Sequence, residues 1–158
     1  MHQQTQIFIL SFGLFLFLPK LSYSQTNSIS LELAGSGIFY SINYERSFLE
    51  REKFTLATRI GFTGFPIYEP REAVFFLPLG LEARLGPKPH QLSLGLGASI
   101  MYITERVFAV RAVPSISYRY QPIDKKMFYK ISYAPFLPVL VDTNLPYLWG
   151  GITIGRDF

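Results

Sequence analysis

The strongest constraint in this sequence is a two-residue alternation of side chains that recurs along most of its length. In FFLPLGLEARL (75–85), large apolar residues occupy the odd positions, and mostly small or charged residues occupy the even ones. Segments 92–102 and 108–120 repeat this pattern. Successive side chains of a β-strand point to opposite faces, so the alternation predicts strands with one apolar and one mostly polar face. The expected fold class is all-β.

The alternation predicts a series of short strands, and nothing in the sequence indicates a second domain. Seven are recognised directly, at 38–48, 54–63, 75–85, 92–102, 108–120, 129–134 and 148–158. An eighth is expected at 28–34, before Gly35–Gly37, where the apolar phase shifts by one residue. These glycines form either a tight turn between two strands or a bulge within one long strand. We favour the turn, because it gives an even number of strands.

The connections alternate in length, as in an outer-membrane barrel with short periplasmic turns and longer external loops. Segments 50–52, 87–90 and 121–126 are short and polar, whereas 65–72 and 138–147 are longer or more irregular. The sequence therefore predicts an eight-stranded antiparallel up-and-down transmembrane β-barrel with both termini in the periplasm.

The N-terminus has the layout of an export signal. Residues 7–18 (IFILSFGLFLFL) form an unbroken apolar run, followed by Pro19-Lys20 and by small residues before Gln25. The run is shorter than the roughly 20 residues that a spanning helix needs, although an uncleaved anchor is the alternative. We predict a signal peptide at 1–24 and an outer-membrane β-barrel at 25–158.

Two features favour a membrane barrel over a soluble one. The non-apolar face is rich in Gly, Ser, Ala and Thr, which suits the narrow interior of a small barrel. Aromatic residues gather near the strand ends, as in the interfacial girdles of membrane barrels. The expected periplasmic girdle is Tyr44, Phe48, Phe54, Tyr118, Tyr120, Tyr129 and Phe158, and the external one is Tyr40, Phe62, Phe65, Phe75, Tyr102, Phe108 and Trp149.

Charges of both signs occupy the face that this model turns inward, where opposite charges can pair. The predicted charge network of the lumen consists of Glu45, Arg59, Glu82, Arg84, Arg111, Arg119, Lys130 and Asp157. Glu45 and Arg59 fall at nearly matching depth on neighbouring strands, so their contact is the first that we expect.

The segments SLELAGSGIFYSINYER (30–46) and SISYRYQP (115–122) resemble small, uncharacterised outer-membrane β-barrel proteins of Bacteroidota. The terminal Phe158, with Ile154 and Ile152 before it, looks like the signal that the barrel-assembly machinery recognises. Arg156 departs from the aromatic or apolar residue more usual at its position. The resemblance implies a β-barrel fold, an outer-membrane location and a transient interaction with that machinery during insertion. It supplies no catalytic residue.

The sequence offers little for catalysis. Cysteine is absent, so thiolate chemistry and cysteine metal sites are excluded. His90 stands in an expected turn without an evident serine partner. The net charge of +4 is scattered, whereas nucleic-acid binding usually shows a concentrated basic stripe. We expect no enzyme activity, cofactor, metal or nucleic-acid partner.

Function is least constrained by the sequence. The leading hypothesis is a packed outer-membrane barrel, in contact with outer-membrane lipid, whose role is structural or rests on surface interactions of loops 64–72 and 138–147. An outer-membrane lipid-modifying enzyme and a soluble exported lipid-binding barrel are the alternatives. The direction of Leu77, Leu79 and Leu81 bears on the last, because a soluble barrel turns its apolar face inward.

Overall fold

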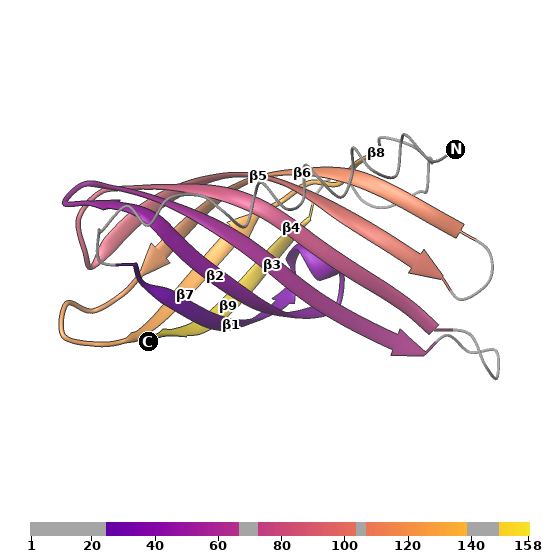
Figure 1. Ribbon diagram of the computed structural model, residues 1–158, viewed down its shortest axis with the longest axis horizontal. Helices are drawn as coiled ribbons and strands as arrows, with labels where there is room; N and C mark the ends of the chain where they lie inside the picture. The colour runs from indigo at the N-terminus through magenta and orange to yellow at the C-terminus, as the bar shows by residue number, and fades with distance from the viewer. Residues whose placement is uncertain (1–24, 67–72, 104–106, 139–148) are drawn as a thin grey trace, which may run out of the picture.

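The computed structural model describes residues 25–66, 73–103, 107–138 and 149–158, which form a closed all-β barrel (Figure 1). The elements are β1 (Asn27–Ala34), the 3-10 turn η1 (Gly35–Gly37), β2 (Tyr40–Arg51), β3 (Phe54–Pro66), β4 (Ala73–Leu85), β5 (His90–Ile103), β6 (Val107–Tyr120), β7 (Met127–Tyr133), β8 (Leu137–Pro138) and β9 (Gly150–Asp157).

All pairings between the strands are antiparallel, and the sheet closes on itself. β1 pairs with both β2 and β9, and β5 pairs with β6. The two-residue β8 continues beside β6 where β7 has ended, so β7 and β8 together supply one wall strand. The predicted eight-stranded antiparallel barrel is confirmed as a fold.

The short connections lie together at one end of the barrel. They are residues 52–53, 86–89 and 121–126, and the C-terminus lies at the same end, on the left of Figure 1. We call this the turn end and the opposite one the loop end. Of the predicted loops 64–72 and 138–147, residues 67–72 and 139–147 lie outside the described residues. β3 continues to Pro66, further than the sequence predicted.

Gly35–Gly37 is a turn between two strands and not a bulge, as expected. Ile38 completes it with φ 69° and ψ −67°, and the Phe39 N–H donates to the Gly37 carbonyl over 3.0 Å. This γ-turn is a rare, strained conformation. The predicted strand 38–48 alternates from an outward Ile38, and this is wrong at its start, because Ile38 turns inward and Phe39 outward.

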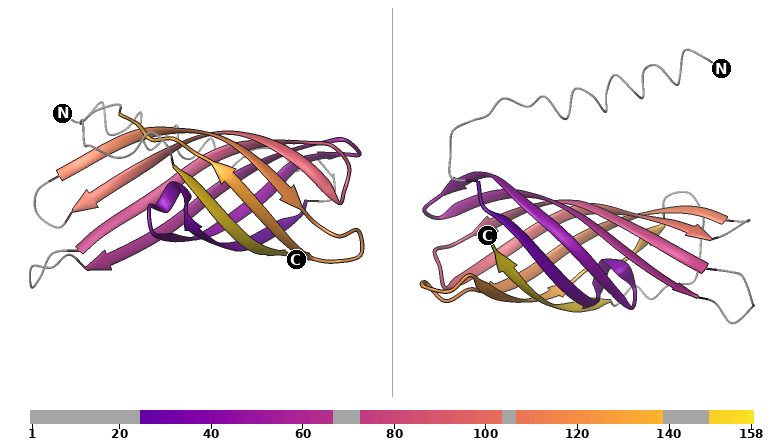
Figure 2. Two further views of the ribbon diagram at one scale, coloured as in Figure 1. Left: turned by 180° about the vertical axis from the view of Figure 1, so that it is seen from behind. Right: turned by 60° about the horizontal axis from the view of Figure 1, so that its bottom comes forward.

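The turn η1, between β1 and β2, folds into the barrel (Figure 2). Gly35, Ser36 and Gly37 are buried, and the β3–β4 and β5–β6 hairpins extend well past η1 (Figure 1). On the loop side of η1, Ile38 packs against two apolar clusters. Their buried members are Val74, Phe76, Met101 and Ala109 in one, and Val113, Ala134 and Phe136 in the other.

Elsewhere the barrel is apolar outside and polar inside. Leu77, Leu79 and Leu81 on β4 are 36%, 36% and 54% exposed, so they point outward. Their even-numbered neighbour Glu82 is buried. This direction is the opposite of that expected for a soluble barrel built around an apolar core.

Most of the predicted girdle aromatics with described side chains are exposed on the outer wall. They are Tyr44, Phe48, Tyr118, Tyr120, Tyr129 and Phe158 near the turn end, and Tyr40, Phe62, Phe75 and Tyr102 toward the loop end. Phe54 is half-buried. Phe65 and Trp149 were wrongly assigned to the external girdle, because both pack against the inner apolar clusters. The side chain of Phe108 lies outside the described set.

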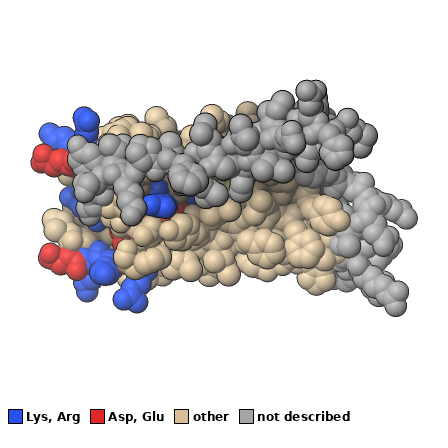
Figure 3. All heavy atoms as spheres, in the orientation of Figure 1, with Lys and Arg blue, Asp and Glu red and all other residues tan. Residues whose placement is uncertain are grey.

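Exposed charge is confined to the turn end of the described barrel, and the rest of the visible described surface is uncharged (Figure 3). The exposed charged residues there are Arg46, Arg51, Glu52, Lys53, Lys88, Asp124, Lys125, Lys126 and Arg156. Within the described residues, no helix is long and apolar enough to cross a membrane.

Candidate functional site

Charged side chains of the described barrel gather in an ion cluster that is buried on the turn side of η1. Glu45, on β2, is 1% exposed and lies at its centre. One carboxylate oxygen accepts hydrogen bonds from Arg84 and, over 3.3 Å, from Nη1 of Arg119. The other accepts from Nζ of Lys130 over 3.2 Å. Strands distant in sequence are thereby joined across the interior.

A second carboxylate makes these contacts into a ring. Glu82 Oε2 lies 3.0 Å from Nζ of Lys130, and Glu82 Oε1 lies 3.1 Å from Nε of Arg84. Arg84 and Lys130 therefore each bridge Glu45 and Glu82. Shared partners of this kind offset the high cost of removing several charges from water.

Arg119 extends the cluster toward the turn end. Its Nη2 donates to Asp157 Oδ1 over 3.0 Å and to the side-chain carbonyl of Gln121 over 3.2 Å. The Gln121 amide in turn donates to Asp157 Oδ2 over 2.6 Å. The guanidinium also lies 3.4 Å from the centroid of the Phe128 ring. Charge-assisted hydrogen bonds and a cation–π contact thus stabilise Arg119 together.

A smaller polar group holds η1 against the barrel wall. Glu32 Oε2 accepts hydrogen bonds from the hydroxyls of Ser36, over 2.8 Å, and of Ser41, over 3.2 Å. Nη1 of Arg59 lies 3.7 Å from Glu32 Oε1. Trp149 adds a hydrogen bond of 2.8 Å from its indole Nε1 to the Gly35 carbonyl.

The residues of the predicted network are distributed over these groups. The structure brings Glu45, Glu82, Arg84, Arg119, Lys130 and Asp157 into one cluster. Arg111 is buried further along β6, opposite Ser99, and is not a member of that cluster. Glu45 and Arg59 are direct partners in the register of β2 and β3, but the expected ion pair is wrong, because Arg59 pairs with Glu32.

Sequence reasoning missed several members of the site. Gln121 was assigned to a connection, and Phe128 to no strand. Each lies two residues from a side chain that points inward, Arg119 and Lys130 respectively, and so falls on the inner face. The two-residue alternation alone identifies them once each predicted strand is extended by one residue. Ser36 gave no such signal, because its place depends on how η1 folds inward.

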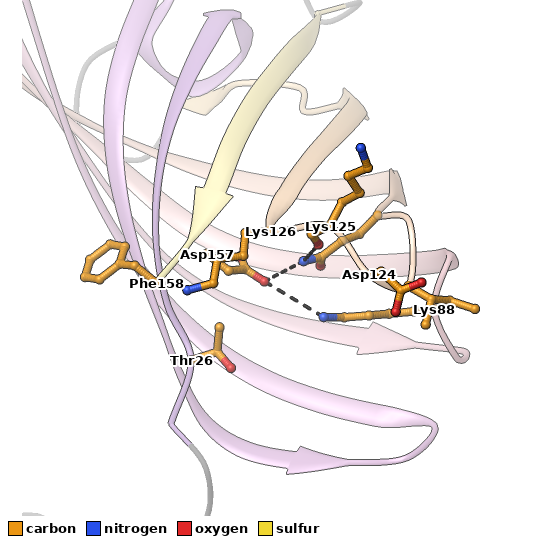
Figure 4. A pocket seen from close by; sticks show the side chains of 9 residues that line it. Thr26, Lys88, Asp124, Lys125, Lys126, Asp157 and Phe158 are labelled. Atoms are coloured by element: carbon orange, nitrogen blue, oxygen red, sulfur yellow. Dashed lines mark hydrogen bonds and ion pairs between the residues drawn. The ribbon is translucent and has the colours of Figure 1, made fainter.

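The cluster reaches the surface at an open pocket of about 380 Å³ at the turn end. Figure 4 shows Asp157 at its edge with Lys88, whose Nζ lies 4.0 Å from Asp157 Oδ2. The pocket is lined by Thr26, Lys88, Gln121, Ile123, Asp124, Lys125, Lys126, Asp157 and Phe158. Charges of both signs surround it, from three lysines and two aspartates.

The other residues singled out by sequence lie on the outer wall or at its end. Ile152, Ile154 and Phe158, the predicted assembly signal, are exposed on β9 and just beyond it. His90, at the start of β5, hydrogen-bonds the Tyr118 hydroxyl and contacts the Tyr120 ring. Among the described residues, no three of His, Cys, Asp and Glu are grouped so as to hold a metal ion.

The cluster is a buried, charge-balanced core that meets the surface only at Asp157 and Gln121 within the described residues. Its three acidic and three basic side chains are at most 11% exposed and bond mainly to one another. Comparison with protein-family models, curated proteins and solved structures found no match for this chain.

Proposed function

We propose that the protein is a small outer-membrane β-barrel with a packed interior, exported by a signal peptide at residues 1–24. Its role in this proposal is structural, or is a surface interaction through loops 64–72 and 138–147. Assembly into the membrane would involve the barrel-assembly machinery and the C-terminal residues Ile152, Ile154 and Phe158.

The observation that carries this proposal is the inside-out distribution of polarity. Leucine and isoleucine side chains cover the outer wall, while Glu45, Arg119 and their partners are buried inside. A closed sheet leaves no unpaired edge, which is what a bilayer requires of strands. Within the described residues, exposed charge lies near one end of the wall, and a strand wall without exposed charge is the distribution expected where hydrocarbon covers it.

Membrane insertion is tested on the protein expressed with its N-terminal segment in a Gram-negative host. We expect it in the outer-membrane fraction, resistant to carbonate extraction, with a folded form that migrates differently from the boiled form on a gel. Release into the carbonate supernatant would refute the membrane proposal. N-terminal sequencing of the purified protein checks the cut before Gln25.

A packed interior predicts negligible ion conduction. Small eight-stranded barrels have an interior that side chains fill, and here the ring of Glu45, Glu82, Arg84 and Lys130 occupies it. Planar-bilayer recordings of the purified protein should show no steady open steps. Reproducible single-channel steps would contradict the packed interior without contradicting insertion.

A further inference from the structure

Two arginines interrupt the otherwise uncharged outer wall of the strands themselves. Arg46 on β2 and Arg156 on β9 are both exposed, and both replace an apolar residue in the outward alternation. The other exposed bases lie in or directly beside the connections, where water reaches them. These two need a different explanation.

The register brings the two arginines to either side of one strand. Ile29 of β1 is the partner of both Tyr44 on β2 and Arg156 on β9, and Asn27 is the partner of Arg46. Neighbouring strands lie about 4.8 Å apart and each residue advances about 3.4 Å. The two backbones are therefore separated by about 10 Å across β1 and about 7 Å along it. Long side chains can approach one small anion from both positions.

Polar donors lie beside the arginines, and neither guanidinium forms an ion pair with a described acid, since the nearby Glu50 carboxylate accepts from the Thr26 N–H over 3.1 Å. The Arg156 side chain makes no hydrogen bond or ion pair to the described residues. Its outward neighbours include Ile29, Met127 and Ile154. Arg46 donates from Nη2 to the Gln25 side chain over 2.6 Å. The side-chain carbonyl oxygen of Asn27 accepts a hydrogen bond from the Tyr44 hydroxyl over 2.9 Å, which leaves the side-chain N–H groups of Asn27 as donors.

The wall beyond the arginines is suited to acyl chains. Ile29, Leu31 and Leu33 continue outward along β1. An apolar groove of about 340 Å³, lined chiefly by Leu33, Ile131 and Ile152, lies further along the same strands, where Gly150 contributes no side chain. Six residues from Arg156 to Gly150 span about 20 Å, or about 14 Å of depth at a tilt near 45°. That depth is about half of a hydrocarbon core of roughly 30 Å.

We propose that Arg46 and Arg156 bind the phosphate of one anionic glycerophospholipid, with its acyl chains along β1 toward the apolar groove. Guanidinium groups bind phosphate through paired, charge-assisted hydrogen bonds. The inference rests on the proposed function, because it requires the turn end to lie at the headgroups of a leaflet.

The test compares lipid retention by purified proteins reconstituted in equal parts phosphatidylglycerol and phosphatidylethanolamine. Native mass spectrometry measures the ratio of the two lipids bound after release into detergent. The wild type should retain phosphatidylglycerol preferentially. This preference should fall roughly fivefold for each arginine removed and roughly 25-fold in R46Q/R156Q. These factors follow from the binding free energy that one basic residue contributes at an anionic surface.

The matched control is Arg51→Gln, which removes an exposed arginine from the same end but at the edge of a connection. It should leave the lipid ratio unchanged, and an equal fall in this variant would overturn the proposal in favour of a diffuse effect of charge. An identical ratio in wild type and R46Q/R156Q would also overturn it. Neither result would contradict insertion, which carbonate extraction measures separately.

If the double variant fails to fold, the single variants R156Q and R156K decide. R156K keeps the charge and should retain part of the preference, whereas R156Q should lose roughly fivefold. A ratio in R156Q equal to that of the wild type would overturn the proposal.

Discussion

The guanidinium carbon of Arg119 lies 3.4 Å from the centroid of the Phe128 ring, and both side chains are almost completely buried. Arg119 also carries the hydrogen bonds that connect Glu45 with Asp157. An apolar ring on the inner face is thus part of the ion cluster, because it packs against a cation whose N–H groups donate to carboxylates.

Replacing Phe128 by leucine should lower the free energy of unfolding by about 2 kcal/mol, because the variant keeps an apolar side chain but loses a desolvated cation–π contact. Urea titration of the protein in phospholipid vesicles, followed by gel migration, measures the change. Tyr129→Leu is the control, since Tyr129 is an exposed neighbour on β7. Equal losses in the two variants would contradict a specific role for Phe128.

Glu45→Gln should destabilise the barrel by about 3–5 kcal/mol, because it leaves buried cations without their shared carboxylate. Removing Lys130 as well should recover part of this loss, so the double variant E45Q/K130M should be more stable than the sum of its single variants predicts. The same urea titration applies. Glu52→Gln, at an exposed turn, should change stability by less than about 0.5 kcal/mol.

The predictability of these contacts depends on how far apart the strands are. The alternation placed Glu45 and Arg59 on the inner face and in matching register, because both properties follow from the pleat and from one short turn. The contacts of Glu45 with Arg84 and Lys130 cross the interior and span 39 and 85 residues of sequence. They depend on the closure of the whole barrel, which no local pattern describes.

The same limit explains the errors near η1. A polarity rule assigns an apolar residue to the outer wall, so it placed Ile38 there. Ile38 turns inward because of its γ-turn, with φ 69°. It can remain there because apolar clusters occupy the interior on the loop side of η1. The sequence patterns do not reveal these buried apolar clusters, whose members Ala109 and Val113 flank the buried Arg111 on β6.

Gly155→Ala should be destabilising by about 1–3 kcal/mol, the usual cost of overpacking a core. A Cβ at this position would overlap the Phe128 ring and approach Cβ of Ser30 to 2.7 Å. Gly80→Ala is the matched control, because its Cβ would meet only backbone atoms, at 3.6 Å and beyond. Urea titration of both variants should separate them, and a neutral Gly155→Ala would show that the ring is not fixed against β9.

Tryptophan fluorescence gives a direct test of which face the lipid covers. The chain contains one tryptophan, and Trp149 packs inward against Phe136 and donates to the Gly35 carbonyl over 2.8 Å. Leu79, midway along β4, points outward. In vesicles of lipid brominated in the middle of its acyl chains, emission from the wild type should be quenched weakly. Emission from L79W/W149F should be quenched strongly, because its ring would contact the bromines.

The emission of each protein in brominated vesicles is divided by its emission in the same vesicles without bromine. A change in emission caused by the substitutions themselves therefore does not affect the comparison. Far-ultraviolet circular dichroism verifies that L79W/W149F keeps its strands. Strong quenching of Trp149 together with weak quenching of the tryptophan at position 79 would mean that acyl chains reach the interior and not the leucine face. That outcome would refute both the membrane proposal and the lipid site built on it, because each requires hydrocarbon against the outer wall.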